Sequence, residues 1–172
     1  AANRPALYGA ISVYNCPSDR PSVNSNFNAQ FGNYGVNWGP LTFVVANRKR
    51  SQEGPFFIKY GARLADVTDG TSNTMLIAEK RMNVGRLGVM QSDDNEGYTS
   101  GVDHDVVRTT NSVPLPDRMS NNSSEYGENR FGSSHSGGMN AAMADGSVQF
   151  LSYSIELQTF RRLGCRCDGE PV

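Results

Sequence analysis

The residues best suited to chemistry in this sequence are a histidine and an aspartate near the C-terminus. His135 is followed, after nine residues, by Asp145-Gly146. A histidine can act as a general base or a metal ligand, and an aspartate can be its partner. The residues between them have the pattern of a strand, at about 3.3 Å per residue, which would separate the two side chains by nearly 20 Å. We therefore expect structural roles, with His135 bonded to nearby backbone and Asp145 in a tight turn with Gly146. A role for His135 as base or ligand is the alternative.

Support for other catalytic machinery is weak. The chain has two histidines, His104 and His135, and none of its serines lies in a Gly-x-Ser-x-Gly pattern. The Gly137-Gly138 pair lacks the Lys-Ser that follows a phosphate-binding loop. The sequence therefore predicts a protein that is not an enzyme.

An acidic stretch at 91–105 is the best candidate for a metal site. Asp93 and Asn95 resemble the opening of a calcium loop, in which alternate oxygen ligands precede a glycine. The position of the usual bidentate glutamate is taken by His104, which Asp103 and Asp105 flank. The stretch is thus either a solvated acidic loop or an irregular Ca²⁺ site with the ligands Asp93, Asn95, Asp103 and Asp105.

Two further segments carry groups that can bind a ligand or fasten a loop. In residues 24–38, aromatic side chains alternate with Asn and Gly, and Phe31, Tyr34 and Trp38 could stack on a sugar or anchor the loop to a sheet. The segment from Asp69-Gly70 to Thr74 is dense in side-chain oxygens. We expect it to form a turn and cap through hydrogen bonds to backbone, with a hard-cation or sugar contact as the alternative.

Hydrophobic patterning predicts short elements separated by long polar loops. We expect a helical turn within 62–67, a helix capped by Ser154 that ends at Leu163, and Gly164 in a left-handed conformation. Residues 109–134 are expected to form an exposed excursion without packed elements. The predicted fold is α+β, a single domain over residues 1–172 with a small antiparallel sheet. The expected strands are 6–16, 41–47, 56–60, 75–79, 139–144 and 147–151.

Composition narrows the classes of partner and compartment. The formal net charge is −1 and no apolar run approaches the roughly 20 residues of a membrane helix, so neither nucleic-acid binding nor membrane spanning by this chain is expected. Charged residues are only 19%, which suits an exported surface protein. The cysteines Cys16, Cys165 and Cys167 allow one disulfide, from Cys16 to one of the late pair, or three thiols in a reducing compartment.

Several separated motifs together resemble one family. They are Cys16-Pro17-Ser18-Asp19, Asn33-Tyr34-Gly35, the 69–74 segment followed by Glu79, and Phe131-Gly132-Ser133-x-His135 with Asp145-Gly146-Ser147-Val148. In this order they are similar to the prepilin-like proteins of planctomycete bacteria, which carry a domain of unknown function once labelled solute-binding and the signature of His, nine residues and Asp-Gly.

The resemblance implies a type IV pilin-like or pseudopilin-like domain, as in type II secretion, without its long N-terminal hydrophobic helix. It implies that a cysteine of that helix pairs with Cys16, and pseudopilin calcium sites lend support to the acidic stretch. The expected function is a non-catalytic extracellular, cell-surface or periplasmic structural subunit. Its expected partners are copies of itself or other pilin-like subunits, with membrane contact only through the helix that precedes this sequence. The alternative is a solute- or glycan-binding module that uses the 24–38 loop.

Overall fold

The computed structural model describes residues 41–45, 56–57, 60–86, 107–121 and 130–172. Its principal element is a five-stranded sheet in the order β5-β1-β4-β6-β7. The strands are β1 (Leu41–Val45), β4 (Met75–Glu79), β5 (Val107–Thr109), β6 (Gly138–Met143) and β7 (Val148–Ser152). Three of the four pairings are antiparallel, whereas β1 and β5 run parallel.

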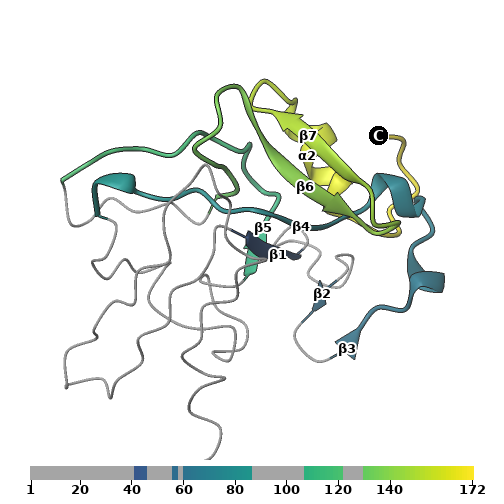
Figure 1. Ribbon diagram of the computed structural model, residues 1–172. Helices are drawn as coiled ribbons and strands as arrows, with labels where there is room; N and C mark the ends of the chain where they lie inside the picture. The colour runs from purple at the N-terminus through teal and green to yellow at the C-terminus, as the bar shows by residue number, and fades with distance from the viewer. Residues whose placement is uncertain (1–40, 46–55, 58–59, 87–106, 122–129) are drawn as a thin grey trace, which may run out of the picture.

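The remaining elements are short. A second sheet consists of β2 (Phe56–Phe57) and β3 (Tyr60–Gly61). Three 3-10 turns, η3 (Leu64–Asp66), η4 (Thr71–Asn73) and η5 (Val84–Arg86), lie on either side of β4 along the chain. The helix α2 (Leu157–Leu163) follows β7 and covers one face of the sheet (Figure 1). The fold is α+β, as the sequence predicted.

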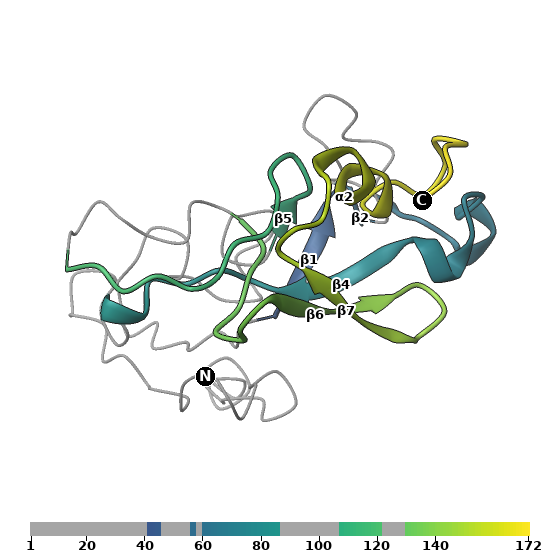
Figure 2. The same cartoon turned by 90° about the horizontal axis from the view of Figure 1, so that it is seen from above.

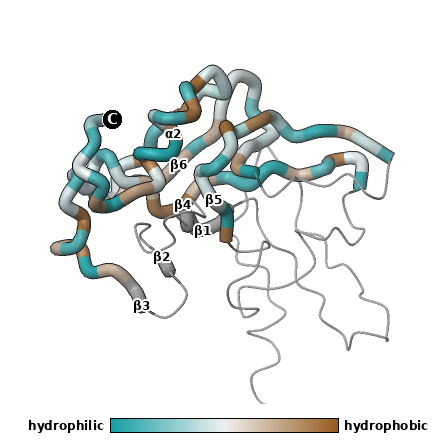
Figure 3. The backbone as a smooth tube through the Cα atoms, turned by 180° about the vertical axis from the view of Figure 1, so that it is seen from behind, coloured by the Kyte–Doolittle hydropathy of each residue, from teal (hydrophilic) through white to brown (hydrophobic). Residues whose placement is uncertain are grey.

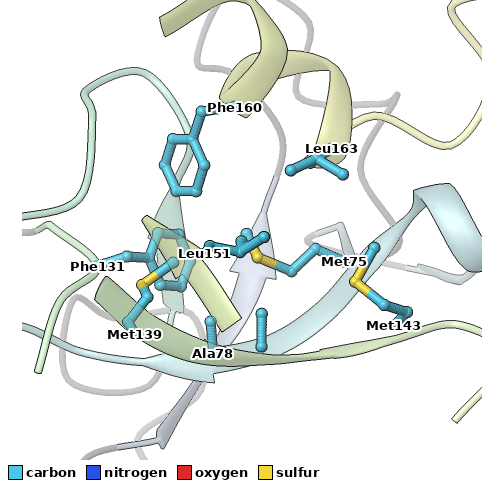
Figure 4. Close-up of a cluster of buried hydrophobic side chains, with 9 residues drawn as sticks. Met75, Ala78, Phe131, Met139, Met143, Leu151, Phe160 and Leu163 are labelled. Atoms are coloured by element: carbon cyan, nitrogen blue, oxygen red, sulfur yellow. The ribbon is translucent and has the colours of Figure 1, made fainter. Parts of the chain in front are cut away.

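The core lies between α2 and the sheet (Figure 4). Alternate residues of β6 face it, because side chains of a strand point to opposite faces. From α2, Phe160 and Leu163 reach the same space one helical turn apart, and the Phe160 ring meets that of Phe131 edge-on with centroids 5.9 Å apart. The buried cluster is Met75, Ala78, Phe131, Met139, Ala141, Met143, Leu151, Phe160 and Leu163.

Hydrophobic and hydrophilic residues alternate in short stretches along the described chain (Figure 3). Such alternation is typical of strands that have one buried and one exposed face. Within the described ranges, no helix combines the length and the apolar character that crossing a membrane requires.

The hairpin of β6 and β7 confirms the two C-terminal strands, but its turn differs from the two-residue turn expected. The Gly146 N–H donates to the Met143 carbonyl (3.0 Å) and the Met143 N–H to the Ser147 carbonyl (2.8 Å). Gly146 has a φ of 86°. This pattern describes a three-residue loop closed by a glycine bulge, because Ala144 joins Asp145 and Gly146 in the turn.

Four other expectations were wrong. The predicted strand 56–60 is two short paired strands. Part of the stretch 109–134 is packed, since Phe131 is fully buried and bridges to Lys80. Gly164 has a right-handed φ of −84°, so a left-handed conformation is not the reason for a glycine at this position. A side chain at Gly164 would instead collide with the side chain of Thr110. The helix also begins later than predicted, with Glu156 as its N-cap.

Candidate functional site

Glu79 is a buried carboxylate at the end of β4, and it lies at the centre of a polar cluster with Asn140 and His135. Its residue exposure is 3%, and it follows the apolar residues of a core strand. One carboxylate oxygen, Oε2, accepts the backbone N–H of Asn140 at 2.7 Å and lies 3.4 Å from the Asn140 side-chain amide. A buried carboxylate needs such donors because removing it from water is costly. Glu79 therefore fastens β6 to β4 through its side chain.

His135 lies against the other oxygen of the same carboxylate. Its Nε2 is 3.3 Å from Glu79 Oε1, with the histidine side chain 26% exposed. This contact forms an ion pair when the imidazole is protonated and a hydrogen bond when Nε2 carries the proton of the neutral ring. Glu79 belongs to the motifs that carry the family resemblance, but no role was predicted for it. The local signal was its position, an acid that ends an otherwise apolar strand.

Ser133 and Tyr153 hold the loop that carries His135. The Ser133 hydroxyl donates to the Gly138 carbonyl at 3.0 Å and accepts the His135 backbone N–H at 3.1 Å. The Tyr153 hydroxyl donates to the Ser133 carbonyl at 2.9 Å and accepts the Ser133 N–H at 3.0 Å. Burial raises the pKa of Tyr153, while the hydrogen bonds to Ser133 act in the opposite direction.

A histidine beside a buried carboxylate supplies two of the three members of a catalytic triad, so the third member, the nucleophile, decides whether a triad is present. Ser133 is nearby, but it is 3% exposed and its hydroxyl donates to a backbone carbonyl. Its hydrogen bond to His135 involves the backbone N–H and not the ring. In this arrangement the Ser133 hydroxyl holds the loop, and the His135 imidazole contacts the Glu79 carboxylate.

Asp69 fastens the C-terminal segment. Its carboxylate accepts the N–H of Asp168 at 2.6 Å and the N–H of Gly169 at 2.9 Å. The backbone N–H groups of Thr68 and Asp69 both donate to the Arg166 carbonyl, at 2.8 and 3.2 Å. Figures 1 and 2 show the C-terminal segment beside the segment that carries η4. Gly70 supports this bend with a φ of 100°, a conformation that favours glycine.

The 69–74 segment also holds the turn of the β6–β7 hairpin. The Asp145 N–H donates to the Thr71 carbonyl at 3.1 Å and the Ala144 N–H to the Thr74 carbonyl at 2.8 Å. The Asp145 carboxylate accepts the Ser147 hydroxyl at 2.7 Å and the Ser147 N–H at 2.9 Å. These two bonds lower the pKa of Asp145, the hydroxyl contributing most. The structure thus brings two separated motifs of the sequence together, whereas His135 and Asp145 have different partners.

The other candidate residues lie outside the described residues. They are the calcium candidates Asp93, Asn95, Asp103 and Asp105, the platform Phe31, Tyr34 and Trp38, and Cys16. Among the residues that are described, no group of three or more His, Cys, Asp or Glu side chains is placed to hold a metal ion. Cys165 is buried and Cys167 is exposed.

Residues 1–158 match the model of a family described as "Protein of unknown function (DUF1559)". The chain belongs to the DUF1559 family. No curated protein and no solved structure matches it significantly.

The DUF1559 match includes the Glu79–His135 cluster and the contacts between the 69–74 segment and the hairpin turn. It ends inside α2, before Asp168 and Gly169. The backbone groups that Asp69 binds therefore lie beyond the part of the chain that the family match covers.

Proposed function

We propose that this DUF1559 protein is a non-catalytic structural subunit of a pilus-like or pseudopilus-like filament or another ordered array. We place it outside the cell, on the cell surface or in the periplasm. The chain is then the globular domain of a pilin-like protein. Copies of the chain are its main partners, and other pilin-like subunits are further ones.

The observation that carries the proposal is that the carboxylates of the family-like motifs bind the protein's own backbone. Asp69, Glu79 and Asp145 each accept hydrogen bonds from the protein's own backbone N–H groups. Charged groups used in this way stabilise the loops and strands whose backbone they bind. A set of short strands and long loops fixed by such bonds suits a building block whose surface must keep one shape.

The geometry of the His135 loop supports the non-catalytic part of the proposal. An enzyme built on His135 would need an accessible group beside the imidazole that can attack or exchange a proton. The nearby Ser133 hydroxyl instead closes a network with Gly138 and Tyr153. Because this network is internal, we expect substitutions in it to change the stability of the fold. We do not expect them to abolish a catalytic activity.

Calcium is part of the proposal as a stabiliser of the 91–105 loop, with Asp93, Asn95, Asp103 and Asp105 as ligands. Carboxylate and amide oxygens are the ligands that this ion prefers. In this role the ion would order a surface loop and so strengthen contacts between subunits.

A pelleting assay tests the assembly. The full chain is concentrated in Ca²⁺ or in a chelator, and the fraction sedimented at high speed is measured against a soluble monomeric protein. The proposal predicts that the pelleted fraction rises with concentration and falls in chelator. A pelleted fraction that is the same with Ca²⁺ and with chelator would contradict the calcium role. A chain that stays in the supernatant in both conditions would contradict the assembly role and favour a solute- or glycan-binding module.

A further inference from the structure

Strand β7 forms one edge of the five-stranded sheet and is unusually open. Within the described part of the chain it pairs with β6 alone. Val148 and Phe150, which lie two residues apart and so share one face, are 68% and 56% exposed. The strand reads Val-Gln-Phe-Leu-Ser and carries neither the charge nor the proline with which proteins commonly block an edge.

The hydrogen-bond pattern of the hairpin shows which backbone groups of β7 face outward. The Met143 N–H donates to the Ser147 carbonyl, and the Tyr153 N–H donates to the Gly137 carbonyl. Residues of an antiparallel pair alternate between bonding inward and pointing away from the partner strand. With the observed register, the residues whose N–H and C=O groups point away from β6 are therefore Val148, Phe150 and Ser152.

We propose that β7 pairs with β7 of a second copy of this chain, antiparallel, about a two-fold axis at Phe150. This inference rests on the proposed assembly function and identifies one contact between its subunits. In this register Phe150 lies opposite Phe150 of the partner subunit, and Val148 lies opposite Ser152 of the partner subunit. Phe150 and Phe150 of the partner subunit then form a hydrogen-bonded pair that exchanges both N–H···O=C bonds. In the two outer pairs the Ser152 carbonyl also accepts the Ile155 N–H of its own chain, at 3.1 Å.

The same strand in a second copy fits this edge for two reasons. Open backbone groups at a sheet edge are matched by another strand, and a strand paired with itself is complementary without any further design. The side chains leave room for it, because the Phe150 ring rests on the sheet over Gly138. A Cβ built at Gly138 would lie 2.7 Å from Phe150 Cε1, so only glycine allows this position of the ring.

The pair would be a weak contact by itself. One strand edge buries less than the roughly 1,200–2,000 Å² of a stable interface, so pairing should depend on concentration. A contact of this symmetry also closes on itself. The pair is therefore the repeating unit of the assembly, and growth requires a second contact elsewhere on the chain.

Cysteine cross-linking tests the register. In a hydrogen-bonded antiparallel pair the Cα atoms are about 5.5 Å apart, within the range that a disulfide spans. Phe150→Cys should therefore form a covalent dimer under mild oxidation of the full chain. Val148→Cys is the matched control, because the two copies of that position would be about 14 Å apart along the strands. The parent chain, with its own cysteines, gives the background, and peptide mapping locates each bond. Equal cross-linking at both positions, or none at Phe150→Cys, would overturn the register.

A charge substitution tests the contact itself. Phe150→Lys places two like charges face to face, so the dissociation constant from sedimentation should rise more than about tenfold. Leu64→Lys is the control, since Leu64 is a similarly exposed hydrophobic residue (67%) in η3, away from β7. Circular dichroism confirms that both variants fold. If the parent assembles and Phe150→Lys assembles equally well, the β7 contact is wrong and the proposed function stands. If the parent stays monomeric at every concentration, both are wrong.

Discussion

Replacing Asp69 by alanine should release the C-terminal segment. The substitution removes both acceptors of the Asp168 and Gly169 N–H groups, which are bound at 2.6 and 2.9 Å. It leaves the backbone bonds from Thr68 and position 69 to the Arg166 carbonyl in place. The loss should therefore be confined at first to the last few residues, followed by a lower overall stability.

The size of the effect follows from these two hydrogen bonds. A hydrogen bond to a charged group contributes about 1.5–3 kcal/mol, and the value falls where water can replace the partner. The bond to Asp168 is half-buried and the bond to Gly169 is exposed. We therefore expect Asp69→Ala to lower the free energy of unfolding by about 2–3 kcal/mol, and Asp69→Asn, which keeps one acceptor oxygen, by about half as much. For a chain of this length the alanine variant should melt about 5–10 °C lower.

The assay combines urea unfolding with hydrogen exchange. The amides of Asp168 and Gly169 should exchange faster in Asp69→Ala than in the parent, because they lose their acceptor. Asp66→Ala is the matched control, since Asp66 is a nearby aspartate whose carboxylate binds the backbone N–H and the exposed side chain of Arg63, three residues away, and not the C-terminal amides. Unchanged exchange at these two amides, or a stability equal to that of the control, would refute the role given to Asp69.

Three further predictions concern packing and protonation. Gly164→Ala should lower stability by about 1–3 kcal/mol in urea unfolding through its collision with Thr110, and Thr110→Ala in the same chain should recover part of the loss; an additive double variant would contradict this reason. Phe160→Ala should cost about 3–5 kcal/mol by opening a cavity beside Phe131, and near-parent stability would contradict the core assignment. The pKa of Tyr153 is raised by burial, so the folded state keeps this proton longer than the unfolded state as pH rises above about 10. Stability should therefore fall with rising pH in that range, and Tyr153→Phe should remove this part of the slope in unfolding curves; an identical slope would contradict it.

The C-terminal hairpin, the strand 75–79 that pairs with it and the end of the helix were the parts of the fold most predictable from sequence. The strands of the hairpin, the strand 75–79 and the end of the helix at Leu163 follow from local patterns of alternation, turn residues and caps. The burial of Phe131 was not predictable in this way, because its polar neighbours have the composition of a surface loop. Its position depends on α2 and on the bridge to Lys80, which are contacts between distant segments.

The candidate site was predicted by residue type but not by partner. His135, Asp69 and Asp145 were singled out by type, and in the structure His135 contacts Glu79 while Asp145 binds Ser147. The Glu79–His135 contact joins residues 56 positions apart, and no local pattern specifies such a pair. Gly164 was a similar case, since a glycine after a helix usually indicates left-handed geometry, whereas here it leaves space for Thr110.

Electron microscopy of the protein isolated from its native source tests the proposed assembly most directly. Particles are imaged before and after addition of a calcium chelator, and Phe150→Lys protein produced in the same source is imaged beside them. The account predicts regular filaments, tubes or lattices from the parent chain that loosen in chelator, and fewer or shorter ones from the variant. Dispersed single particles of the parent in both conditions would contradict the claim that this DUF1559 protein is a structural subunit.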